Sequence, residues 1–148
     1  MFKIEKELKD TYLLCATEST SLDYFRIMTG KISLYYAAII DILNEIYYFV
    51  SYQVNIDPVD VDLLVGTQLL NKIRNIENMV RRTIIQPELY KELINLFNGR
   101  NLIIHRGVVW IMANENESDV KLRKLYLKMY MRYVEAYKML KETNRKIR

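Results

Sequence analysis

The sequence predicts an all-α fold, an up-and-down bundle of about five helices that forms a single domain over residues 1–148. Gly and Pro, the residues that mark turns, number only 4 and 2, whereas many short strands would need frequent turns. Hydrophobic residues make up 51% and charged residues 27%, which is typical of a chain with a core. Apolar residues also recur at steps of three and four, the period of a helix buried on one side.

The first two predicted helices cover residues 3–16 and 22–52. A polar cluster at residues 17–21 separates them and supplies an N-cap for the second helix. The second helix carries the clearest apolar seam of the sequence, of the kind that packs at a shallow angle against neighbouring helices or a second copy. This seam consists of Phe25, Met28, Ile32, Tyr35, Ile39, Ile42, Ile46 and Phe49.

The third predicted helix covers residues 59–83 and follows a turn at residues 55–58. Pro87 stands at the favoured first position of a fourth helix. Asn98 and Gly99 predict a C-cap or a local break, after which apolar residues resume.

A polar turn at residues 114–118 precedes the last predicted helix, which Ser118 or Asp119 caps and which reaches the C-terminus. Two helices have inner faces that the spacing of apolar residues defines. The expected core residues are Val65, Leu69, Ile73, Ile76 and Val80 in the third helix, and Leu122, Leu125, Met129, Tyr133, Tyr137 and Leu140 in the last.

Several classes of protein are excluded by composition. Asp41 and Glu45 interrupt the richest apolar run, so no segment is expected to span a membrane. The first residues are charged where a signal peptide would be apolar, and one cysteine cannot build a disulfide framework or a cysteine-rich zinc site. We therefore expect a soluble, cytoplasmic protein with no metal and no cofactor. For the pair Asp41 and Glu45, an ion pair with an arginine of a neighbouring helix or protomer is favoured over metal binding or a contact to Arg100.

The charge is divided unevenly along the chain. The net charge is +4, but the segment from Lys121 onward carries +8, which leaves −4 for the rest. Such a division favours a strip that binds a nucleic-acid backbone, and the alternative is a solvated helix face with cations near its C-terminal dipole. The candidate RNA-binding residues of this helix are Lys121, Lys124, Lys128 and Arg132. The 12 tyrosines could stack on RNA bases, although packing within the bundle is the favoured interpretation.

The residues best suited to chemistry are Arg100, Asn101 and His105, the only histidine. Asn101 and His105 are four residues apart and share a helix face. If Gly99 breaks the backbone, Arg100 and Asn101 begin a new helical segment, whose free N–H groups favour an anion. An arginine fork and an amide can bind the phosphate of a phosphodiester, and an imidazole that titrates near neutral pH can transfer a proton to or from it. From spacing alone, the alternative is a hydrogen-bonded histidine at a helix interface with Arg100 on the surface.

Residues 100–105 resemble the Arg-x4–6-His signature of the HEPN superfamily (higher eukaryotes and prokaryotes nucleotide-binding), in which a polar residue, commonly Asn, follows the arginine. The resemblance implies a HEPN-like helical domain and a metal-independent endoribonuclease. It implies that His105 is the catalytic acid or base, that Arg100 clamps the scissile phosphate, and that Asn101 orients the imidazole or the phosphate. The RNA 2′-hydroxyl would attack the adjacent phosphorus and leave a 2′,3′-cyclic phosphate.

The resemblance also implies partners. It implies a homodimer, in which two copies of the motif face each other across a cleft that holds RNA. It further implies the toxin of a toxin–antitoxin or other defence pair, with a nucleotidyltransferase-type antitoxin. Toxins of the HepT type commonly place a tyrosine, the target of modification by that antitoxin, two residues after the histidine. Here that position is Gly107, which argues against this modification, whereas Arg106 adds a candidate phosphate contact.

Two alternatives from other functional classes keep the same fold. In the first, the chain is a HEPN-type protein that binds nucleotides or RNA, or serves as a scaffold for a partner, without catalysis. In the second, the apolar seam at residues 25–49 is an assembly surface and His105 belongs to the core.

Overall fold

The structure is a computed structural model, which describes residues 6, 9, 21–58, 65–113 and 120–148. At residues 21–22, 101–113 and 120–122 the backbone alone is described. Every regular element within the described residues is an α-helix, which confirms the predicted fold class. None of these helices is long and apolar enough to cross a membrane.

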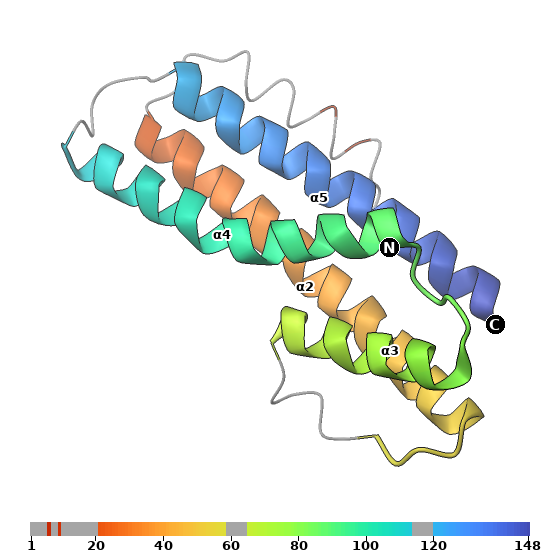
Figure 1. Ribbon diagram of the computed structural model, residues 1–148. Coiled ribbons are helices and arrows are strands. Elements are labelled where there is room, and N and C mark those ends of the chain that lie inside the picture. The colour runs from red at the N-terminus through yellow and green to blue at the C-terminus, as the bar shows by residue number, and fades with distance from the viewer. Residues whose placement is uncertain (1–5, 7–8, 10–20, 59–64, 114–119) are drawn as a thin grey trace.

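Within the described residues four helices pack together, where about five were predicted for the chain (Figure 1). They are α2 (Ser21–Gln53), α3 (Gly66–Val80), α4 (Pro87–Ala113) and α5 (Val120–Ile147). The predicted first helix over residues 3–16 lies outside the described residues, apart from positions 6 and 9. The predicted start of α4 at Pro87 is confirmed.

Helix α2 is the centre of the bundle, because it contacts α3, α4 and α5, and α5 covers most of its length. In Figure 1, α2 and α3 run in the same direction, α4 runs opposite to both, and α5 runs opposite to α4. The up-and-down alternation therefore holds from α3 to α5 but not between α2 and α3. Twelve residues separate α2 from α3. A connection of this length spans more than the length of α3, since an extended residue covers about 3.3 Å and each of the 15 residues of α3 rises about 1.5 Å. The connection is therefore long enough for α3 to begin beside α2 and to run in the same direction.

The core lies between α2 and α5 and is rich in tyrosine. The predicted seam of α2 is confirmed, since six of its eight residues are buried and Phe25 and Phe49 are partly buried against the cluster. Tyr35 meets Tyr130 edge to face, with ring centroids 5.5 Å apart. The Tyr133 hydroxyl donates to the Leu96 carbonyl oxygen at 3.2 Å. The predicted packing of tyrosines within the bundle is therefore confirmed for Tyr35, Tyr130 and Tyr133.

Three residues predicted to face the core are exposed instead. Val65 precedes the first turn of α3 and Val80 is its last residue, so both lie beyond the buried part of the helix. That part consists of Leu69, Leu70, Ile73 and Ile76. On α5, Leu125 is turned outward because the adjacent Tyr126 occupies the core position.

Gly66 lets the start of α3 approach α2 and α4 closely. A Cβ at this position would lie 2.7 Å from the Phe97 ring and 3.1 Å from Ile40 Cδ1. We therefore expect Gly66→Ala to lower the free energy of unfolding by about 1–3 kcal/mol, as overpacking does. Gly30→Ala is the matched control, because a Cβ there meets nothing within 4 Å and Ala favours a helix. Urea denaturation of both variants tests this, and equal shifts in the same direction would contradict it.

Candidate functional site

Helix α4 carries the candidate catalytic residues and is continuous from Pro87 to Ala113. The break predicted at Asn98 and Gly99 is therefore wrong, and Gly99 has no positive φ. Glycine within a helix costs only about 1 kcal/mol relative to alanine. Burial of Leu93 and Leu96 just before it stabilises the helix by about 1.5–3 kcal/mol each. No helix start exists at residue 100, so the anion site expected from free N–H groups there is absent.

Arg100 lies partly buried between α4 and α2. Its Nη2 donates to Ser33 Oγ at 3.3 Å. Its Cζ lies 4.7 Å from the centroid of the Tyr36 ring, within the range of a cation–π contact. Two residues of α2 thus hold the guanidinium in a defined position.

An aromatic contact between α2 and α4 supports the position of Tyr36 under the Arg100 guanidinium. Tyr36 meets Phe97 edge to face, at 5.5 Å between ring centroids and 82° between planes. Phe97 and Arg100 are three residues apart on α4 and share a face of the helix. Because Phe97 also rests against Gly66, the packing of α3 is linked to the position of Arg100.

Tyr133 of α5 lies in the same region of the interior. Burial raises the pKa of its hydroxyl well above the usual range, and the positive charges of Arg100 and Arg132 oppose this shift. The hydroxyl therefore stays protonated and donates to the Leu96 carbonyl oxygen. Tyr133 thus ties α5 to α4 one turn before Arg100.

Asn101, His105 and Arg106 all lie on the helical backbone of α4. One helical turn separates residues 101 and 105, as their spacing predicts. The side chains of these three residues, and that of Lys121 on α5, lie outside the described residues.

The candidate RNA-binding residues on α5 form what we call the basic strip, which consists of Lys124, Lys128 and Arg132. Lys124 and Lys128 are exposed, one turn apart, and form no ion pair with any other described residue. Arg132 differs, because its Nε donates to Glu92 Oε1 of α4 at 2.9 Å. A shallow hollow of about 500 Å³ runs along the strip, over Leu127 and Met131 among others. The strip therefore offers two lysines without an ion pair to any residue that the structure describes, and one arginine that also bridges helices.

Asp41 and Glu45 are both exposed on α2. Glu45 Oε2 accepts from Asn144 Nδ2 at 2.8 Å and pairs with Arg148 Nη2 at 3.5 Å. The predicted ion pair with an arginine is thus confirmed for Glu45, and Arg148 directly follows the last residue of α5. Within the described part of the chain, no group of three His, Cys, Asp or Glu residues could hold a metal ion.

Ser33 and Tyr36 are the residues that sequence reasoning missed. They flank the apolar seam of α2, and 67 residues separate Ser33 from Arg100. Nothing in the local sequence distinguishes them from other polar or aromatic residues on a helix flank. Only the packing of α2 against α4 reveals their contact with the guanidinium.

Comparison of the chain with protein-family models, with curated proteins and with solved structures finds no match.

Proposed function

We propose that this protein is a metal-independent endoribonuclease with a HEPN-like helical domain, whose candidate active site is built on α4 from Arg100, Asn101 and His105. The observation that supports it most is the position of Arg100. A guanidinium that α2 holds by a hydrogen bond to Ser33 and by the Tyr36 ring is already oriented before a phosphate arrives. Preorganised charge of this kind stabilises a transition state without a cost of reorganisation.

Each residue has a distinct part in the proposed reaction. The RNA 2′-oxygen forms a bond to the adjacent phosphorus while the bond from phosphorus to the 5′-oxygen breaks. One imidazole accepts the proton of the 2′-hydroxyl, and a second donates a proton to the leaving 5′-oxygen. Arg100 offsets the charge that develops on the phosphate, and Asn101 orients the imidazole or the phosphate. A homodimer would supply both imidazoles as two copies of His105.

The cleavage proposal is tested by incubating total cellular RNA with the purified wild-type protein in the presence of EDTA. We expect new fragments that carry 2′,3′-cyclic phosphate and 5′-hydroxyl ends, because the 2′-oxygen displaces the 5′-oxygen from phosphorus. They should form in EDTA, because the proposed route transfers protons between oxygen and imidazole and uses no metal. RNA that stays intact under these conditions would contradict the proposal. For the proposed biological role, a toxin of a toxin–antitoxin or defence pair, the expected partner is a nucleotidyltransferase-type antitoxin.

The basic strip is expected to bind the RNA backbone. Replacing Lys124 and Lys128 by glutamine removes two cations that have no ion-pair partner among the described residues. For single-stranded RNA, the slope of log binding constant against log salt should decrease in magnitude by about 1.4. The matched control replaces the exposed Arg26 and Lys91 by glutamine. Salt titrations by fluorescence anisotropy test this, and an unchanged slope in the Lys124 and Lys128 variant would exclude the strip from the RNA path.

RNA binding without cleavage is the second candidate function, and it is favoured by Lys124 and Lys128 of the basic strip, which are exposed and unpaired among the described residues. It predicts binding that survives replacement of His105 and weakens when Lys124 and Lys128 lose their charge. RNA that is bound but not cleaved by the wild-type protein would favour this candidate.

A further inference from the structure

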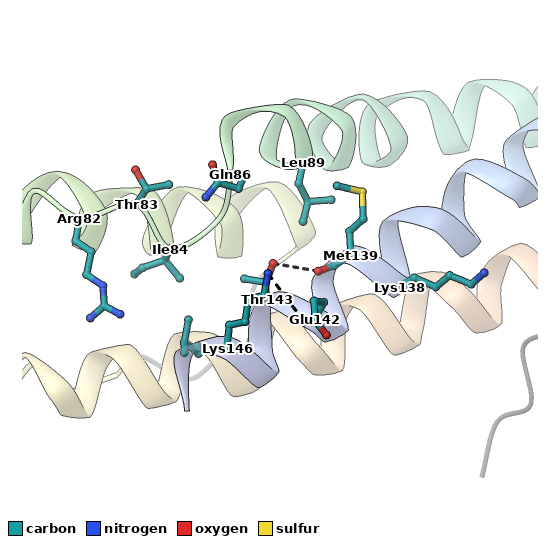
Figure 2. Close-up of a pocket in the computed structure, with 11 residues that line it drawn as sticks. Arg82, Thr83, Ile84, Gln86, Leu89, Lys138, Met139, Glu142, Thr143 and Lys146 are labelled. Atoms are coloured by element: carbon teal, nitrogen blue, oxygen red, sulfur yellow. Dashed lines mark hydrogen bonds and ion pairs between the residues drawn. The ribbon is translucent and has the colours of Figure 1, made fainter.

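A second hollow lies at the opposite end of α4 from the candidate active site, and we call it the α5-end pocket (Figure 2). Its volume of about 520 Å³ falls within the range of small-molecule sites. The connection between α3 and α4, the first turn of α4 and the last turns of α5 form its walls. From Pro87 to residue 105, α4 rises by about 27 Å, so the pocket is separate from the candidate active site.

Two cations from different segments line this pocket. Arg82, in the connection after α3, is exposed, and its guanidinium forms no ion pair with another described residue. Lys146, on the last turns of α5, extends toward Thr143 in Figure 2, and its Nζ lies 4.0 Å from Glu142 Oε1. A third cation, Lys138, stands at the rim and extends away from the centre.

The one acidic residue among those described around the pocket is already neutralised. Glu142 Oε2 accepts from Arg145 Nε at 2.9 Å, and a second guanidinium nitrogen of Arg145 contacts Oε1. The hydrogen bond from Arg145 lowers the pKa of Glu142, so this carboxylate stays ionised and paired near neutral pH. The pocket therefore keeps a surplus of positive charge that an anion would offset.

The floor of the pocket is aliphatic. Ile84 and Leu89 are buried beneath it, and Met139, which is 44% exposed, borders it from α5. Within the described lining there is no aromatic ring on which a nucleobase could stack. The side chains of Thr83 and Thr143 add hydroxyl groups, of which Thr143 Oγ1 donates to the Met139 carbonyl oxygen.

We propose that the α5-end pocket binds a small organic phosphate with a short aliphatic body. The phosphate would draw the exposed side chains of Arg82 and Lys146 toward it, since two cations suit the double charge of a phosphate monoester better than the single charge of a carboxylate. The aliphatic body would cover Ile84, Leu89 and Met139. This proposal does not depend on RNA cleavage at α4.

Isothermal titration of the wild-type protein with hexyl phosphate, and separately with inorganic phosphate, tests the pocket. Hexyl phosphate should bind at one saturable site, at least about tenfold more tightly than inorganic phosphate, because each buried methylene strengthens binding about fourfold. Absence of saturable binding, or equal binding of the two ligands, would overturn the proposal. Occupation of the pocket by a 5′-phosphorylated RNA in place of the small phosphates would also overturn the proposal, because the pocket would then be part of an RNA path.

Variants of the two cations make the test specific. Arg82→Gln and Lys146→Gln should each weaken hexyl phosphate binding by about tenfold or more, as loss of a charged hydrogen bond does. Arg26→Gln, at an exposed arginine near the start of α2, is the matched control and should leave binding unchanged. Arg82→Gln should also leave the rate of RNA cleavage unchanged. The experiment therefore distinguishes failure of the proposed phosphate site from failure of the proposed ribonuclease activity. Wild-type affinity in Arg82→Gln would contradict the assigned site.

Discussion

Replacing His105 by alanine is expected to lower the rate of RNA cleavage by at least about 10²–10⁴-fold, the usual contribution of one general acid or base, because a homodimer would lose both. His105 is the only histidine of the chain, so no other imidazole can replace it near neutral pH. Phosphate contacts by Arg100 and the basic strip do not involve His105, so RNA binding should persist. Single-turnover cleavage and binding, both measured in EDTA, separate the two effects.

Two further variants make this prediction sharper. Asn95→Ala, at an exposed position of the same helix, should cleave at the wild-type rate. Arg100→Lys keeps the charge but loses the fork that reaches Ser33, so it should lower the cleavage rate without abolishing binding. A His105→Ala variant that cleaves as fast as the wild type would rule out the assigned role.

Glu77→Ala is expected to lower the free energy of unfolding by about 2–4 kcal/mol, because two buried backbone N–H groups would lose their acceptor. Glu77 is 6% exposed, and its Oε2 accepts from the N–H groups of Ile84 and Ile85 at 2.6 and 3.1 Å. Its Oε1 accepts from Arg74 Nε at 3.2 Å. Since a domain of this size is stable by about 5–15 kcal/mol, the loss is a large share of the total.

Glu77 has this effect because it joins two helices. Its backbone carbonyl accepts from Arg81, which has a left-handed φ of 54°, and from Arg82, so α3 ends on this residue. Arg74 in turn lies over the Tyr90 ring of α4, 3.8 Å from its centroid. The carboxylate thus holds the connection that leads into α4.

Urea denaturation measures the effect of Glu77→Ala. The control is Asn78→Ala, one residue later on the exposed side of α3, for which we expect a change of less than about 0.5 kcal/mol. Equal stability of the two variants would show that the carboxylate does not hold the connection.

The apolar periodicity was sufficient to predict most of the fold. The seam of α2 and the start of α4 at Pro87 depend on local spacing and on proline geometry, which a sequence displays directly. The break at Gly99 was wrong because the local preference of glycine is weaker than the burial of Leu93 and Leu96 beside it. Likewise, the parallel course of α2 and α3 follows from how the helices pack and not from any local signal.

The candidate site was predictable only in part. Arg100, Asn101 and His105 are neighbours in the sequence, so one motif predicts them together. Ser33 and Tyr36 reach Arg100 from another helix, and the motif says nothing about them. The same holds for Glu92, whose contact with Arg132 limits how freely one cation of the basic strip can meet RNA.

The proposed attack by the 2′-hydroxyl is best examined with an RNA oligonucleotide that carries a single 2′-O-methyl group at the cleaved position. We expect that the wild-type protein, in EDTA, cuts the unmodified oligonucleotide to a 2′,3′-cyclic phosphate and leaves the methylated one intact there, because the attacking 2′-hydroxyl is blocked. Equal cleavage of both oligonucleotides would contradict the claim that Arg100 and His105 promote attack by the 2′-hydroxyl.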